Sequence, residues 1–225
     1  MTVRLFSVTI DQNGEIDPAW ARVLSAAELA KAARFYRAED RRAYAAAHAL
    51  KRLALATRTG AAPAALVFDT LTNGKPVLAA MQSPCDFSLS HTAGCVAVAV
   101  GSGPVGVDVE NGRRVAVNPD LALAALGTQG AAALGHDHSS PAWRDAFFAA
   151  WTLREAVVKA DGSGLEAIIR VRPDDTGASL DGRRWRVSRW TMAEHHLAAA
   201  CQTDHDIRHT RLDTNALSAW CARVP

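Results

Sequence analysis

The sequence predicts a mixed α/β (α+β) fold in two halves, each combining strands with one long helix. Its 225 residues suffice for one large domain or two small ones. A hydrophobic fraction of 49% permits a substantial core. Two long helical patterns, at 38–58 and 141–160, are each accompanied by short strand patterns. We therefore divide the chain into an N-terminal half, 1–104, and a C-terminal half, 105–225.

The N-terminal half begins with the alternating strand Val3–Ile10. A capping box at 25–28 then opens a helix that extends to about Tyr36. The alanine-rich stretch Ala38–Arg58 follows as a second helix, because alanine favours helix, and Gly60 stops it. Turn chemistry at 72–76 precedes the remaining strands of this half, 87–90 and 95–100.

The C-terminal half begins with the strand Val105–Glu110. Small residues and histidines over 127–140 predict a loop before the long helix, which ends at 161–164. The tail after Asp204 is polar and basic, without a clear pattern. Further strands are expected at 168–171, 185–190 and 196–201. The helix at 143–160 and the strand at 196–201 are candidate counterparts of the helix at 39–58 and the strand at 95–100.

Composition and charge exclude several classes of protein. A formal charge of +2 argues against a nucleic-acid binder. The four cysteines show no Cys-x-x-Cys spacing, which argues against a zinc site and against a disulfide framework. No signal peptide is recognisable, and no apolar run reaches the ~20 residues that span a bilayer. We expect a cytoplasmic protein without nucleic-acid or membrane partners.

Two carboxylates lie close together on the predicted strand Gly106-Val107-Asp108-Val109-Glu110. Alternate side chains of a strand share a face, so Asp108 and Glu110 lie ~7 Å apart on one side. A cation would relieve their repulsion, and hard oxygen ligands favour magnesium, calcium or manganese. Two acids at this spacing are also common on a solvated strand face, and the motif alone favours that ordinary interpretation.

A second set of residues recurs every four positions on the long C-terminal helix. Trp151, Glu155 and Lys159 therefore share one helical face. Glu155 could serve as a third metal ligand or as a general base, and Lys159 could hold a phosphate. The alternative is an exposed Glu–Lys pair, which stabilises a helix by about 0.2–0.5 kcal/mol.

Two shorter motifs lie in the N-terminal half. The stretch Phe87-Ser88-Leu89-Ser90-His91 ends a strand, where Ser90 and His91 point to opposite faces and make a poor nucleophile–base pair. No Gly-x-Ser-x-Gly elbow is present. The turn Gly74-Lys75-Pro76 presents the Lys75 ammonium and is stiffened by proline. A capped strand end and an exposed turn lysine are the plainer alternatives.

The order of these four motifs resembles that of the 4′-phosphopantetheinyl transferases of the surfactin-synthetase-activating type. The stretch from Phe35 to Arg52, with Arg41 and His48, is also similar to the N-terminal helix of that family. The resemblance covers about residues 34 to 165. Each motif alone is modestly specific, whereas four in order at matching spacing are highly specific, so their combination outweighs the ordinary interpretations.

The resemblance implies an enzyme that moves the phosphopantetheine arm of coenzyme A to a serine of an apo acyl, polyketide or peptidyl carrier protein. It implies Mg²⁺ dependence, release of 3′,5′-adenosine bisphosphate, and a role in fatty-acid or secondary-metabolite biosynthesis. The family fold is a monomeric pseudodimer of two similar, pseudo-symmetric α/β subdomains, each a small sheet packed on a long helix, with the active site in the cleft between them.

The resemblance also implies roles for individual residues. Asp108, Glu110 and Glu155 match the magnesium ligands, and Glu155 matches the candidate base for the carrier serine. Lys159 is implied as a catalytic residue that contacts phosphate. Contacts to the nucleotide and phosphates of coenzyme A are implied for Lys75, Ser90, His91, Arg154, Arg41 and His48.

Two residues depart from the family pattern, and rival interpretations use the same acids. Arg154 stands where lysine is frequent, and the planar guanidinium is not equivalent to an ammonium. Ser88 replaces a frequent asparagine.

A Mg²⁺-dependent nuclease, phosphatase or other phosphotransferase would bind metal without coenzyme A. A degenerate module would bind coenzyme A without turnover, and a structural protein would leave the motif order unexplained.

Overall fold

The computed structural model describes residues 2–11, 14–79, 85–202 and 204–224. Its strands are β1 (Thr2–Thr9), β2 (Phe68–Thr70), β3 (Pro76–Leu78), β4 (Asp86–Thr92), β5 (Cys95–Gly101), β6 (Val105–Asn111), β7 (Arg172–Asp174), β8 (Gly177–Leu180), β9 (Arg183–Met192), β10 (His195–Gln202) and β11 (Asp206–Asp213). Its helices are α1 (Pro18–Val23), α2 (Ala26–Ala33), α3 (Ala38–Thr59), α4 (Pro119–Ala132), α5 (Pro141–Asp161) and α6 (Thr214–Ala222), with 3₁₀ helices η1 (Pro63–Ala65) and η2 (Leu165–Arg170).

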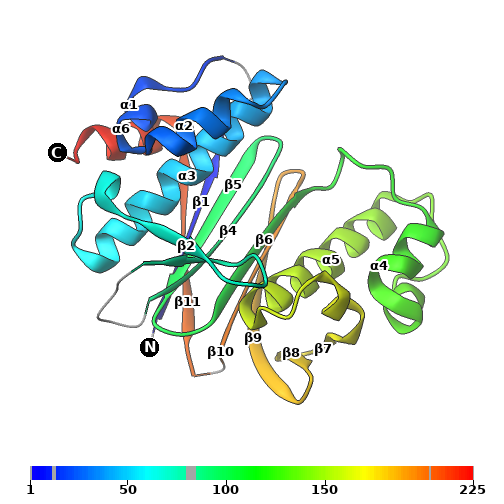
Figure 1. The fold of residues 1–225 in the computed structure, drawn as a ribbon. Coiled ribbons are helices and arrows are strands. Elements are labelled where there is room, and N and C mark those ends of the chain that lie inside the picture. The colour runs from blue at the N-terminus through cyan, green and yellow to red at the C-terminus, as the bar shows by residue number, and fades with distance from the viewer. Residues whose placement is uncertain (1, 12–13, 80–84, 203, 225) are drawn as a thin grey trace.

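The predicted mixed α/β fold is confirmed, and it is organised around two main sheets (Figure 1). The first sheet has the strand order β11-β1-β5-β4, and the second has the order β6-β10-β9-β8-β7. The short strands β2 and β3 form a separate antiparallel hairpin. The predicted boundary at 104/105 lies between β5 and β6, which belong to different sheets.

Each long helix packs against one of the main sheets. Buried alanines and leucines of α3, such as Leu50, share a core with valines of β5, such as Val98. Small residues of α5, such as Ala156, pack against Ala198 and Ala200 of β10. Gly60 and Gly162 end these helices in the left-handed conformation that glycine adopts without a steric penalty. The helices predicted at 38–58 and 141–160 are thereby confirmed.

A close approach between β6 and α5 positions the acidic strand motif. A Cβ atom on Gly106 would lie 1.9 Å from the Ala156 carbonyl oxygen, so only glycine allows this contact. Side chains of β4 also hold β6 in place, because Ser88 Oγ accepts a hydrogen bond from the Val107 amide at 3.1 Å. Asp86 accepts a second one from the Val105 amide at 3.0 Å. The two main sheets are therefore joined where β4 contacts β6.

The end of the chain returns to the first sheet. Strand β11 pairs in parallel with β1, with Val3 opposite Ile207, and α6 packs on α1 and α3 (Figure 1). The Trp20 indole donates a hydrogen bond to Ser218 at 3.0 Å. Side chains of β11 are only partly buried or exposed, which explains why the sequence after Asp204 gave no strong pattern.

Two expectations for the C-terminal half are wrong. Residues 127–140 were expected to form a loop, but α4 extends to Ala132; the non-helical Gly127, with φ 69° and ψ 174°, interrupts it and disrupts the helical pattern. Residues 168–171 were expected to form a strand, but most of them belong to η2. None of the described helices combines the length and the apolar character needed to cross a membrane.

Candidate active site

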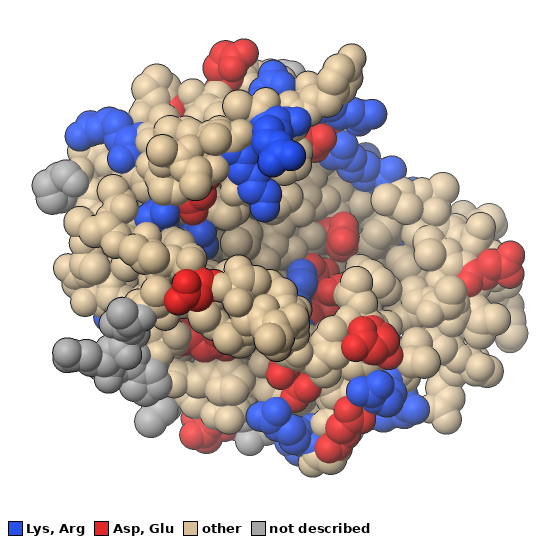
Figure 2. Space-filling view, viewed as in Figure 1, with Lys and Arg blue, Asp and Glu red and all other residues tan. Residues whose placement is uncertain are grey.

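Residues from all four of the sequence motifs come together around one region between the two halves of the chain. Figure 2 shows that the molecule is hollowed on this face, with acidic and basic side chains in the hollow. A pocket of about 440 Å³ lies between the β2–β3 turn, β4 and the C-terminal end of α5. Its lining includes Gly74, Lys75, Pro76, Phe87, Ser88, Leu89, Glu155, Lys159, Gly162, Gly164 and Leu165.

The β2–β3 turn is fastened to both sides of this pocket. The Asn73 amide donates a hydrogen bond to the Gly162 carbonyl oxygen at 2.7 Å, which ties the turn to the end of α5. The Lys75 ammonium lies 2.6 Å from Asp86 Oδ2 on β4. The sequence analysis did not assign Asn73 or Asp86 to the site. Asn73 could have been found, because it directly precedes the Gly-Lys-Pro motif.

Asp108 lies at the contact between β4, β6 and α5. Its side chain is buried, with the whole residue only 3% exposed. Asp108 Oδ1 accepts hydrogen bonds from Ser90 Oγ at 2.8 Å and from the Lys159 ammonium at 2.6 Å. Asp108 Oδ2 is also buried and accepts no hydrogen bond from the described residues. A buried carboxylate oxygen without a partner is costly and is a suitable ligand for a cation.

The other two predicted acids lie within electrostatic reach of Asp108. Burial, followed by the negative charges of Asp108 and Glu155, raises the pKa of Glu110 to about 7. Burial and the charge of Asp108 also raise the pKa of Glu155, while Lys159, at 3.9 Å, opposes the shift. These acids therefore repel one another in a poorly solvated site, as carboxylates that share a cation do.

The carboxylates of this region do not by themselves form a ready metal cage. Among residues 2–11, 14–79, 85–202 and 204–224, no group of three His, Cys, Asp or Glu side chains is arranged to hold a metal ion. Instead, the Lys159 ammonium is the cation in contact with Asp108. Although burial opposes its charged form, the carboxylate of Asp108 raises the pKa of Lys159.

The remaining predicted ligands of the N-terminal half have different surroundings. Ser90 faces Asp108, whereas His91 follows it on β4 and is exposed. Arg41 donates hydrogen bonds to the carbonyl oxygens of Phe35 and Tyr36, so it braces the chain between α2 and α3.

His48 belongs to a cluster of charged side chains between α2, which carries Glu28, and α3, which carries Lys51 and Arg52. Glu28 lies 2.9 Å from His48 Nδ1, 2.8 Å from Lys51 and 2.6 Å from Arg52. Burial alone would raise the pKa of Glu28, but the hydrogen bond with His48 and the charge of Lys51 lower it below its usual value. The ring of His48 also stacks on Tyr44, with the centroids 4.0 Å apart.

The structure does not bring Arg154 to the pocket that contains Glu155 and Lys159. Adjacent positions on a helix are rotated by about 100°, so Arg154 projects from a different face of α5. It donates a hydrogen bond to the Ala150 carbonyl oxygen at 3.0 Å and lines a separate pocket beside α4.

Comparison with known proteins agrees with the grouping of these motifs. Residues 104–221 match the model of the 4′-phosphopantetheinyl transferase superfamily. Residues 17–102 match the model described as 4′-phosphopantetheinyl transferase, N-terminal. The two matches meet at the boundary between β5 and β6.

Individual relatives are also named as phosphopantetheinyl transferases. A 4′-phosphopantetheinyl transferase of Bacillus subtilis is 30% identical over 166 residues, which cover 72% of each chain. The 4′-phosphopantetheinyl transferase HetI of a Nostoc species is 31% identical over 72% of this chain and 70% of its own. An L-aminoadipate-semialdehyde dehydrogenase-phosphopantetheinyl transferase of Eremothecium gossypii is 31% identical over 89% of this chain and 72% of its own. The chain therefore belongs to the 4′-phosphopantetheinyl transferase superfamily and is a transferase.

Proposed function

We propose that this transferase moves the phosphopantetheine arm of coenzyme A to a serine hydroxyl of an apo carrier protein and releases 3′,5′-adenosine bisphosphate. The observation that carries the proposal is the joint lining of one pocket by Lys75, Ser88, Glu155 and Lys159, which come from three of the four motifs. The pocket lies at the contact between the two halves, where a donor and a carrier protein could approach together.

The chain supplies a base and positive charge, while the partner supplies the nucleophile. The Glu155 carboxylate accepts the proton of the carrier serine, and its raised pKa makes it a better base than an ordinary glutamate. The serine oxygen then attacks the phosphorus that bears the pantetheine. The bond from that phosphorus to the bridging oxygen breaks, and the bisphosphate leaves with the electron pair.

Lys159 and Lys75 bind and orient the pyrophosphate. Lys159 is held at the pocket by Asp108 and keeps its charge, so its ammonium can neutralise phosphate oxygens as negative charge builds on the leaving group. Lys75 lines the same pocket from the β2–β3 turn, which is held by Asn73 and Asp86. We keep His91, Ser90, Arg41 and His48 as proposed contacts to the nucleotide end.

The donor chemistry of the site suits Mg²⁺. The unpartnered Asp108 Oδ2 and the raised pKa values of Glu110 and Glu155 describe oxygens that a hard cation would stabilise. Asp108, Glu110 and Glu155 would hold the ion. When bound, Mg²⁺ would stabilise the negative charge that develops on the pyrophosphate.

The direct test is the mass of the carrier. The purified protein is incubated with coenzyme A, Mg²⁺ and each of several apo carrier proteins, from fatty-acid, polyketide and nonribosomal-peptide systems. A gain of the phosphopantetheine mass, lost when the acceptor serine is replaced by alanine, supports the proposal. Binding of coenzyme A without a mass gain on any carrier would contradict it and favour a binding module.

A further inference from the structure

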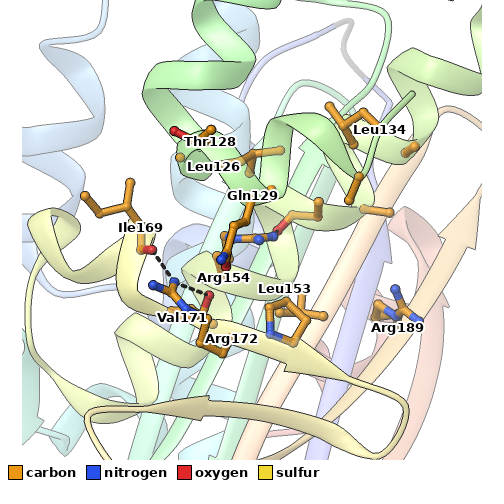
Figure 3. Close-up of a pocket in the computed structure, with 17 residues that line it drawn as sticks. Leu126, Thr128, Gln129, Leu134, Leu153, Arg154, Ile169, Val171, Arg172 and Arg189 are labelled. Carbon is orange, nitrogen blue, oxygen red and sulfur yellow. Dashed lines mark hydrogen bonds between the residues drawn. The ribbon is translucent and has the colours of Figure 1, made fainter. Parts of the chain in front are cut away.

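A second pocket lies between α4, α5, η2 and the start of β7 (Figure 3). Its volume is about 750 Å³, larger than that of the pocket at Glu155 and Lys159. Within the described part of the chain, no residue lines both pockets. The second pocket is therefore a separate feature that the transferase reaction does not explain.

Arg154 gives this pocket a buried positive charge. The residue is only 6% exposed, and burial followed by the charge of Arg172 lowers the pKa of Arg154. Nη1 is satisfied by the Ala150 carbonyl oxygen, but the buried Nε has no hydrogen-bond partner among the described residues. A buried guanidinium without a counter-charge is unfavourable, and in most proteins such a group is paired.

Two more arginines line the same pocket. Arg172 donates a hydrogen bond to the Ile169 carbonyl oxygen at 2.6 Å, and Arg189 lies on β9 (Figure 3). In the described part of the chain, the pocket lining contains no aspartate or glutamate. Three like charges around one cavity repel one another, and an anion from outside the chain would relieve that repulsion.

The rest of the wall is largely apolar. Leu126 of α4 and Leu134, which follows the end of that helix, face the cavity together with Leu153 of α5 and Ile169 of η2 (Figure 3). An oxyanion alone would leave these side chains without a partner, whereas an alkyl chain would cover them. The volume is typical of sites that hold a ligand of moderate size.

Glycine in α4 makes room for the guanidinium. A Cβ atom on Gly130 would lie 2.8 Å from Arg154 Nη2 and 2.7 Å from Leu126 Cβ. The helix is also broken at Gly127, just before this point. The local sequence of α4 thus keeps the Arg154 head in the cavity wall.

We propose that this pocket binds an amphipathic organic anion. Its carboxylate or phosphate head pairs with Arg154 and Arg172, because the guanidinium fork matches two oxygens of either group. Its apolar chain packs against Leu126, Leu153 and Ile169. The ligand belongs to the class of medium-chain fatty acids and alkyl phosphates.

The test is calorimetric titration of the full chain with four probes below their micellar concentrations. The probes are dodecanoate, dodecyl phosphate, uncharged dodecanol and acetate. We expect saturable binding of dodecanoate or dodecyl phosphate, and binding of dodecanol and acetate that is at least about tenfold weaker, since each lacks one of the two contacts. The stronger of the two charged probes identifies the head group. No saturable binding of either one, or equally tight binding of dodecanol, would overturn the proposal.

Variants locate the binding in this pocket. Arg154→Met removes the unpaired buried charge at similar volume, a change that need not destabilise the fold. Arg172→Ala changes an exposed residue, so it remains informative if Arg154→Met does not fold. Each variant is expected to bind the charged probe about tenfold more weakly or worse, because a charge-assisted hydrogen bond is lost. The control Arg170→Ala removes a neighbouring surface arginine that pairs with Asp181 outside the pocket. Unchanged affinity in both pocket variants would refute the assignment.

Discussion

The Lys159 ammonium lies 2.6 Å from Asp108 Oδ1, so an ion pair connects helix α5 to strand β6. Ser90 Oγ donates to the same oxygen from β4 at 2.8 Å. One carboxylate oxygen thus joins a strand of the first sheet, a strand of the second and the long C-terminal helix. The contact fixes the position of the ammonium at the edge of the proposed coenzyme A pocket.

A double-mutant cycle should detect coupling between these two residues. Lys159→Met leaves the buried Asp108 carboxylate without its cation, and Asp108→Asn leaves the half-buried Lys159 ammonium without its anion, whereas the double variant removes both charges. We expect a coupling free energy of about 1–3 kcal/mol in the free energy of unfolding, measured by urea denaturation. The same cycle on Arg183 and Asp161, a pair with a mostly exposed arginine, should give less than about 1 kcal/mol. If the losses of unfolding free energy from the two single substitutions simply added up in the double variant, the predicted coupling of Asp108 and Lys159 would be wrong.

Glu155→Gln should abolish most of the transfer while the fold remains intact. The substitution keeps the shape of the side chain but removes the proposed proton acceptor, and the loss of a general base typically costs 10²–10⁴-fold in rate, so we expect a decrease of about a hundredfold or more. The measurement is the initial rate of carrier modification, with circular dichroism as the check of folding. Glu166→Gln, at an exposed position on η2, is the matched control and should keep its activity.

Removal of divalent cations should stop transfer, and added Mg²⁺ should restore it. Because an ion that binds only the folded protein stabilises it, Mg²⁺ should also raise the melting temperature of the free enzyme. Asp108→Asn should lose most of this rise, since the unpartnered Oδ2 becomes part of an amide. Undiminished transfer in the presence of a strong chelator would contradict the proposed metal role.

His209 should make the protein less stable in mild acid. Burial, followed by the charge of Arg211, lowers the pKa of His209 to about 4, and its Nε2 lies 2.8 Å from Ser7 Oγ. The native ring is therefore neutral, while the unfolded ring takes up a proton below about pH 6.5. Stability is lost as the pH falls from about 6.5 towards 4.

The size of that effect is measurable by urea denaturation at neutral pH and near pH 4.5. His209→Gln should reduce the loss of unfolding free energy between the two conditions by about 2 kcal/mol, since glutamine does not titrate. His136→Gln, at an exposed position, should leave the loss unchanged. An identical acid dependence in wild type and His209→Gln would contradict the prediction.

Glu28→Gln should be strongly destabilising. Glu28 compensates two buried cations, Lys51 and Arg52, and breaking a buried pair by removing one partner typically costs about 3–5 kcal/mol. The free energy of unfolding measures the effect. Glu39→Gln removes an acid that pairs with Arg37 and Arg114 near the surface and should cost less than about 1 kcal/mol. Similar losses in both variants would show that burial does not set the cost.

Local features of the fold and site were readable from the sequence because they depend on neighbouring residues. The capping box at Ser25, the glycine stops at Gly60 and Gly162, and the helical spacing of Glu155 and Lys159 all act within one or two turns. The helix α4 was missed because Gly127 interrupts it, and β11 was missed because it buries no complete face. Both failures come from weak hydrophobic periodicity.

By itself, the sequence determined the mixed α/β class, the two long helices and the order of the four motifs. Only the tertiary structure decided that β11 returns to pair with β1, that Lys159 reaches Asp108, and that Arg154 opens into a different pocket from Glu155. The physical reason is that these relations depend on the packing of segments far apart in the chain. Which charged side chains come into contact depends on how these segments pack and bury them. A local sequence pattern does not contain that information.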